Sequence, residues 1–84
     1  MDLHNSARKH GVADEDIVHA AAHALVGFAL EDDECEPRRT LLLGPTRAGN
    51  LLEVVVLELD NGRRLAIHAM PMRSKYRDHL PRQS

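Results

Sequence analysis

Residues 51–77 read LLEVVVLELDNGRRLAIHAMPMRSKYR, and the fold predicted for the chain depends mainly on these residues. Two runs of mainly aliphatic residues, 51–59 and 64–70, flank the dipeptide Asn61-Gly62. Asn-Gly between such runs is the strongest local signal for a β-hairpin, because both central residues of a two-residue turn take positive φ angles. The stretch therefore predicts two antiparallel strands, and Pro71, which lacks a backbone donor, stops the second.

The turn also assigns each side chain to one face of the sheet. Paired residues share a face, as do residues two apart along a strand. With Asn61-Gly62 as the turn, the predicted pairs are Leu59 with Arg64, Leu57 with Ala66 and Val55 with His68. One face, presumed open, then carries Glu53, Val55, His68 and Met70; the other, a core covered by helices, receives Val54, Val56, Ile67 and Ala69.

The residues before the hairpin predict two helices and two more strands. A short helix over 5–10 is closed by Gly11, and a second helix begins at Asp14, where an acidic first turn suits the helix dipole. The second helix fades around Ala24, and its apolar stripe consists of Ile17, Val18, Ala21 and Leu25. Strands follow over 26–30 and 38–43, separated by an acidic turn over 31–36.

This order predicts an α+β fold in a single domain over residues 1–84. The sheet is a small antiparallel meander of three to four strands with the N-terminal helices packed on one face. Residues 73–80 add a short C-terminal helix. A chain of 84 residues lies near the lower limit for independent stability, so a partner chain or a homo-oligomer is expected to contribute.

Composition bounds the classes of function. The single cysteine, Cys35, forms no internal disulfide, and the sequence shows neither a signal peptide nor an apolar run long enough for a membrane span. We therefore expect a soluble cytoplasmic protein. Residues 1–37 hold two basic and nine acidic side chains, whereas residues 38–84 hold nine basic and four acidic ones. Such asymmetry favours a basic face for an anion, unless folding interleaves the two halves and cancels the field.

Two groups of residues near the end of the hairpin are candidates for chemistry. Glu53 and His68 share the open face, where a carboxylate can orient an imidazole for proton transfer; the alternative is a surface histidine at a strand end. The basic tail that follows comprises Arg73, Lys75, Arg77 and Arg82, with Tyr76 among them. These cations suit phosphates and the tyrosine suits a nucleic-acid base, although a solvated helix has the same composition.

Other histidines are weaker candidates. His19 and His23 have the four-residue helical spacing of a zinc pair, but no further ligands accompany them and they are expected to face solvent opposite Ile17 and Ala21. The sequence therefore predicts no metal site and no cofactor. His10, between Lys9 and Gly11, either caps a helix end or extends the basic face.

Several short motifs resemble the BrnT family of RelE-like toxins. They are the segment Arg8-Lys9-His10-Gly11-Val12 before an acidic helix start, the pair Asp32-Asp33, the strand 41–44, and the hairpin ending Ile67-His68-Ala69 before a basic helix. The resemblance spans about residues 4–80. It implies a small α+β endoribonuclease that cleaves mRNA without a metal, the toxin of a type II toxin–antitoxin pair neutralised by a cognate antitoxin protein.

On this reading His68 or His10 acts in proton transfer beside Glu53, and Arg73 and Tyr76 complete the catalytic set. The phosphate track adds Lys75 and Arg77, with Arg64 and Arg47 as further candidates. Two features depart from the family: residues 1–4 are too short for its opening strand, and Met70 stands where it tends to carry arginine. The alternative function is a non-catalytic interaction module of the same fold, stabilised by a partner or by homodimerisation; a histidine-based metal-binding protein is a third.

Overall fold

The structure is a computed structural model that describes residues 1–30 and 38–81. The predicted acidic turn, with Asp32, Asp33 and Cys35, and the cation Arg82 lie outside these residues. The elements along the chain are β1 (Asp2–Leu3), the 3-10 helix η1 (Asn5–Arg8), α1 (Asp14–Ala22), β2 (Val26–Ala29), β3 (Arg38–Pro45), β4 (Leu51–Glu58), β5 (Arg64–Pro71) and the 3-10 helix η2 (Ser74–His79). The predicted α+β class is confirmed.

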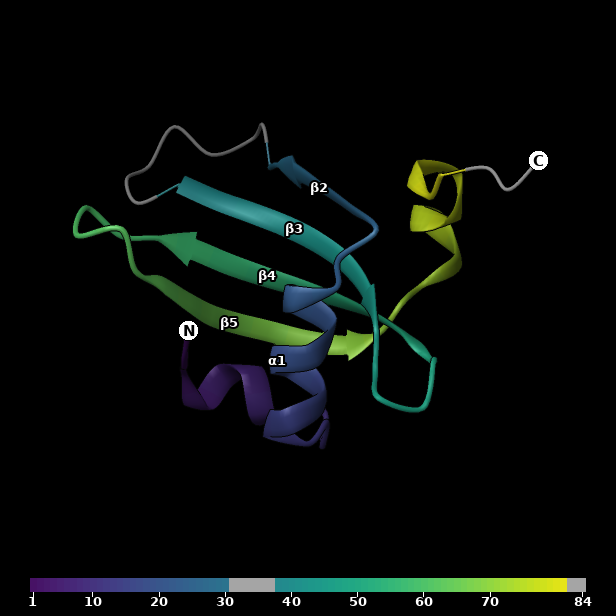
Figure 1. The fold of residues 1–84 in the computed structure, drawn as a ribbon, viewed down its shortest axis with the longest axis horizontal. Helices are drawn as coiled ribbons and strands as arrows, with labels where there is room; N and C mark the ends of the chain where they lie inside the picture. The colour runs from purple at the N-terminus through teal and green to yellow at the C-terminus, as the bar shows by residue number, and fades with distance from the viewer. Residues whose placement is uncertain (31–37, 82–84) are drawn as a thin grey trace.

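The strands form one mixed sheet in the order β1-β5-β4-β3-β2 (Figure 1). Strands β2 to β5 are antiparallel neighbours, as predicted. The prediction of three to four strands, all antiparallel, was wrong at the edge, because β1 runs parallel to β5 and pairs Asp2 with Leu65 and Leu3 with Ala66. Two residues suffice for this strand because they add to an edge that β5 already presents.

The hairpin turn differs from the predicted one by one residue. The backbone amide of Leu59 donates to the carbonyl of Arg63 at 2.9 Å, so the loop has three residues, Asp60 to Gly62. Gly62 has a φ of 80°, while no described residue other than glycine has a positive φ, so Asn61 does not adopt the conformation of a two-residue turn. A turn closed by a left-handed glycine is the usual three-residue hairpin loop.

A β-bulge in β5 compensates for this difference. Near the turn, Leu57 pairs with Leu65 and Glu58 with Arg64, one position away from the predicted register. Val56 pairs with Ala66 and Val55 with His68, so Ile67 is an extra residue without a partner in the ladder. The pairing of Val55 with His68 is confirmed because two single-residue offsets cancel. Ala66 takes the core position predicted for Ile67, which is only partly buried.

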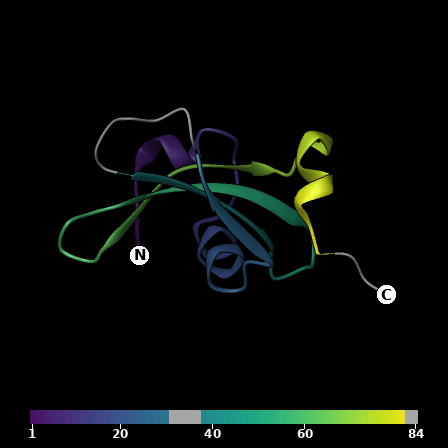
Figure 2. The same cartoon turned by 90° about the horizontal axis from the view of Figure 1, so that it is seen from above.

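Helix α1 covers one face of the sheet (Figure 2). It packs Ile17 and Ala20, both fully buried, against Leu42, Val54 and other core residues. Only part of the predicted apolar stripe was right, because Val18 is 43% exposed and Leu25 is 53% exposed. The buried residues of this nine-residue helix are Ile17 and Ala20.

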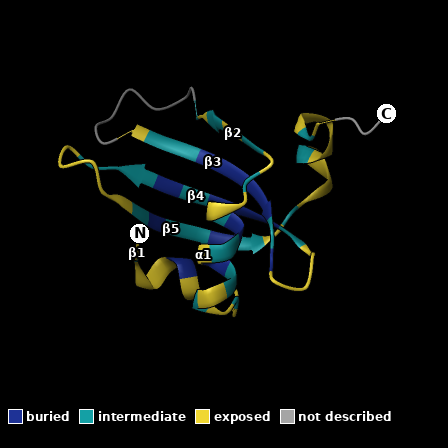
Figure 3. Cartoon of the chain, viewed as in Figure 1, coloured by how far each residue is buried: buried dark blue, intermediate teal, exposed yellow. Residues whose placement is uncertain are grey.

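The opposite face is more buried than predicted. Leu41 and Leu43 of β3 share this face with Phe28, Val55 and Glu53 through their pairings, and Leu41, Leu43 and Glu53 are at most 1% exposed. Figure 3 shows buried positions running through the centre of β3, β4 and β5, with exposed ones at the hairpin tip. Within the described residues, no helix is long and apolar enough to cross a membrane.

Candidate active site

Glu53 is the centre of the candidate site. Its side chain is 1% exposed, yet both carboxylate oxygens have partners. Oε1 accepts from Arg73 Nη2 at 2.7 Å and lies 3.0 Å from His68 Nε2. Oε2 accepts from the backbone amide and from Nε of Arg73, both at 3.1 Å. Burial raises the pKa of this carboxyl, but the hydrogen bonds from Arg73 and His68 outweigh burial and leave the pKa below its ordinary value.

Arg73 lies between β5 and η2, and its side chain is 47% exposed. The hydrogen bond to Glu53 raises its pKa, so the guanidinium stays charged. A guanidinium has five N–H donors, of which Nε and Nη2 donate to Glu53, and a hydrogen bond with Tyr76 also raises the pKa of Arg73. Because the side chain is half exposed, an anion can reach the donors that remain. Arg73 is thus held by the sheet on one side and half open to solvent on the other.

His68 is placed by the bulge in β5. Bulges commonly redirect a side chain near functional sites, and here the extra residue, Ile67, immediately precedes His68. The Ser6 hydroxyl donates to the carbonyl of Ile67 at 2.6 Å and so ties η1 to the bulge. No sequence signal pointed to Ser6, because a lone serine in a short helix is unremarkable.

The structure brings His10 to the same place. Its ring lies edge-on to the ring of His68, with centroids 5.6 Å apart and planes at 79°. Tyr76 lies next to Arg73, whose guanidinium carbon is 5.7 Å from the ring centroid, and Lys75 Nζ is 5.0 Å from the same centroid. All five residues predicted as catalytic therefore form one connected group, which consists of His10, His68, Glu53, Arg73 and Tyr76. Lys75 joins this group through its contact with Tyr76.

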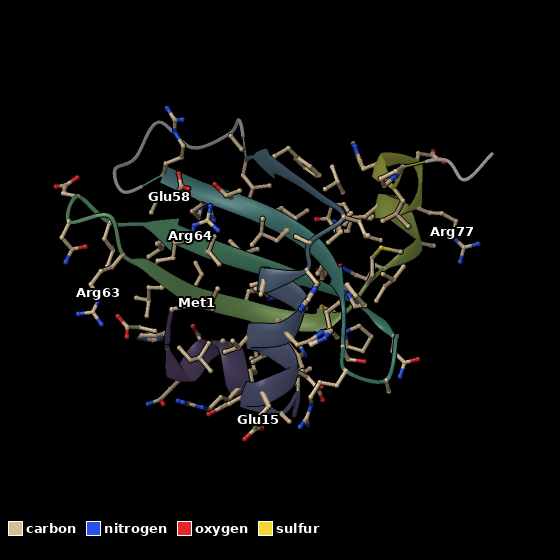
Figure 4. All side chains as sticks on the ribbon, in the orientation of Figure 1. Met1, Glu15, Glu58, Arg63, Arg64 and Arg77 are labelled. Carbon is tan, nitrogen blue, oxygen red and sulfur yellow. The ribbon has the colours of Figure 1, made fainter. Side chains whose placement is uncertain are left out.

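Two predicted phosphate-binding residues lie elsewhere, and a third is on the margin. Arg64 is at the hairpin end of β5, where it pairs with Glu58 at 3.3 Å, far from Arg77 on η2 (Figure 4). Arg47 pairs with Asp16 of α1 at 2.9 Å. Arg77 points away from the sheet into solvent, on the same short helix as Lys75. The sequence did not indicate which end of the sheet Arg64 and Arg47 occupy, and the structure places both away from Arg73.

The prediction that His19 and His23 both face solvent was wrong for His19. His19 is partly buried, and its Nδ1 lies 2.8 Å from the carbonyl oxygen of Pro45, because the end of β3 packs against this helix. His23 is exposed and stacks on His19 with ring centroids 4.3 Å apart. Among residues 1–30 and 38–81, no three His, Cys, Asp or Glu side chains are grouped as metal ligands.

The two oppositely charged halves of the chain partly neutralise each other. Arg63 pairs with Asp2 at 2.8 Å, and Arg47 with Asp16 at 2.9 Å. Both pairs join the acidic half to the basic half. In the described part of the chain, Lys75 and Arg77 of η2 closely follow Arg73, so three basic side chains are grouped near this end of the chain.

Comparisons with models of protein families, with curated proteins and with solved structures gave no match. The resemblance to BrnT toxins therefore stays a prediction from short motifs.

Proposed function

We propose that the chain is a metal-independent endoribonuclease that cleaves mRNA, the toxin component of a type II toxin–antitoxin pair. The observation that carries the proposal is the buried carboxylate of Glu53, which binds the imidazole of His68 and the guanidinium of Arg73 at once. Cleavage of RNA by its own 2′-hydroxyl needs a base near that hydroxyl and a cation near the scissile phosphate. His68 and Arg73 supply these two chemistries side by side.

Each group has a separate role. Glu53 orients His68 and Arg73 and is not itself the base, because both of its oxygens already accept hydrogen bonds and its pKa is lowered by them, against the effect of burial. With Nε2 of His68 donating to Glu53, Nδ1 is the ring nitrogen left to accept a proton. Arg73 binds the phosphate through the donors that Glu53 leaves, and Lys75 adds positive charge beside Tyr76.

The test is cleavage of a single-stranded RNA by the purified protein in the presence of a chelator. We expect products with a 2′,3′-cyclic phosphate and a 5′-hydroxyl, and no cleavage of DNA of the same sequence, which lacks the nucleophile. His68→Ala should lower the rate by about 10²–10⁴-fold, the usual contribution of a general base. His23→Ala, which removes an exposed histidine outside the site, is the matched control.

Expression of the chain alone should arrest growth, and His68→Ala should relieve the arrest. A purified, folded protein that neither binds nor cuts RNA at low salt, and that causes no arrest, would refute the proposal. The non-catalytic interaction module would then be the better account. One observation favours that alternative in such a case: the ion pair between Glu53 and Arg73 also fastens the C-terminal segment to the sheet, a role that needs no chemistry.

A further inference from the structure

We propose that His10 is the general acid of this site, paired with His68 as the general base. The inference rests on the proposed function and specifies its mechanism. It starts from the contact between the two rings, 5.6 Å apart and edge to face, which come from opposite ends of the chain. Two imidazoles at this separation reach two different oxygens of one phosphate bound beside them.

His10 is held in place although its side chain is exposed. Before it, Ala7 is fully buried in the core; after it, Val12 packs against the same core. Between them the chain reverses at Gly11, which has a φ of 77° and whose amide donates to the carbonyl of Arg8 at 3.1 Å. The backbone of His10 is therefore held on both sides, and its imidazole contacts that of His68.

Among residues 1–30 and 38–81, the two other charged side chains bonded at this site, Glu53 and Arg73, are not suited to donate the proton. Glu53, from β4, is held by Arg73 and has its pKa lowered by hydrogen bonds that outweigh the effect of burial, so it is ionised at neutral pH. Arg73, from the segment before η2, keeps its proton throughout. The opposite charges of these two residues cancel.

His68 and His10 together account for both proton transfers of the cleavage reaction. Nδ1 of His68 accepts the proton of the 2′-hydroxyl as the 2′-oxygen forms a bond to phosphorus. The bond from phosphorus to the 5′-oxygen breaks, and the imidazolium of His10 donates its proton to that oxygen. The products are a 2′,3′-cyclic phosphate and a 5′-hydroxyl. Transfer of a proton from His68 to His10 through solvent restores both groups.

The experiment compares two RNA substrates that differ in the leaving atom, a normal 5′-oxygen and a 5′-sulfur. A thiolate leaves without protonation, so loss of a general acid matters only for the oxygen substrate. We expect His10→Ala to cut the oxygen substrate about 10²-fold or more slowly than the parent and the sulfur substrate at nearly the parental rate. His68→Ala should be slow on both, and His23→Ala should match the parent on both.

The pH dependence gives a second readout on the same variants. The parent should show a bell-shaped rate with the oxygen substrate, since it needs His68 neutral and His10 protonated. His10→Ala should lose the fall at high pH. If His10→Ala cuts both substrates like the parent, or is equally slow on both, the assignment is overturned while the proposed function stands. If the folded parent cuts neither substrate, both are overturned.

Discussion

Arg73 donates to the carboxylate of Glu53 with its backbone amide as well as its guanidinium, at 3.1 Å and 2.7 Å. A buried group near the start of β4 thus fixes the point at which the chain leaves β5 for η2. The same carboxylate lies 3.0 Å from His68. The position of the C-terminal cations and the orientation of the histidine are consequently set by one side chain.

Replacement of Arg73 should destabilise the fold more than replacement of an exposed arginine. Arg73→Ala leaves Glu53 buried with His68 as its remaining side-chain partner, and an underpaired buried carboxylate is costly. Arg63→Ala removes an ion pair with Asp2 whose members are 64% and 48% exposed, and such pairs contribute little. We expect the midpoint of thermal unfolding to fall by several degrees for Arg73→Ala and hardly at all for Arg63→Ala. Equal midpoints for the two variants would contradict the role given to Glu53.

The stability of the fold should decrease in acid. Burial raises the pKa of Glu53, but hydrogen bonds from Arg73 and His68 bring it below the ordinary value of 4.5, so the folded state takes up this proton at lower pH than the unfolded state. The resulting stabilisation is complete above about pH 4.5 and is lost as the pH falls through the folded-state pKa. Urea unfolding at a series of pH values measures it.

Glu53→Gln is the variant that isolates this contribution. It removes the titrating group, so the free energy of unfolding should fall less steeply as the pH is lowered. Among the described residues, Asp14 and Asp16 also contribute, because hydrogen bonds from Arg8 and Arg47 lower their pKa values. An identical dependence of stability on pH in parent and variant would show that the pKa of Glu53 is the same in the folded and unfolded states, which would contradict the lowered pKa.

Gly44 should be intolerant of any side chain. A Cβ at this position would overlap the carbonyl group of Ala20, because α1 lies directly on β3 there. The obstacle is backbone, so relief requires the helix to move, at a cost of about 1–3 kcal/mol or more. Gly27→Ala is the comparison, since the one tight contact of its Cβ would be with Cδ2 of Leu42, at 2.8 Å, which a rotamer change can relieve; the carbonyl oxygen of Leu41, at 3.7 Å, is at an ordinary contact distance. Urea unfolding should rank Gly44→Ala as the less stable variant.

The sequence predicted the parts of the fold that local chemistry determines. Alternation along 51–59 and 64–70 identified both strands, and the acidic first turn located the start of α1 at Asp14. It did not predict the bulge at Ile67, because no residue type there marks an extra position and the bulge is fixed by a hydroxyl from Ser6, far away in the sequence. The turn was misjudged because Asn-Gly also suits a three-residue loop with glycine last.

The sequence predicted which residues belong to the candidate site better than it predicted how they are arranged. His68 and Glu53 follow from strand pairing, and Arg73 from its nearness to the strand end. The contact of His10 with His68 is tertiary: it requires η1 to pack along β5, which depends on β1 joining the sheet edge. Short strands such as Asp2–Leu3 have no periodic signal, so neither the strand nor its consequence for His10 is visible in the sequence.

Gly11 offers a test of whether the placement of His10 matters separately from stability. Gly11 and Gly49 have φ angles of 77° and 92°, and an added Cβ would meet nothing within 4 Å at either position. Alanine at each therefore introduces the same backbone strain, about 1–2 kcal/mol for a left-handed residue, without a steric clash. We expect Gly11→Ala and Gly49→Ala to lower the free energy of unfolding by similar amounts in urea titrations.

Their effects on RNA cleavage should differ. Relief of strain at Gly11 shifts the adjacent His10 away from His68, whereas Gly49 lies in the loop between β3 and β4. Cleavage of the oxygen substrate by Gly11→Ala should fall by about tenfold or more, since a small misplacement of a catalytic group is costly. Gly49→Ala should cut at the parental rate. Equal rates for two equally destabilised variants would show that the turn at Gly11 serves the fold alone and that His10 needs no fixed position.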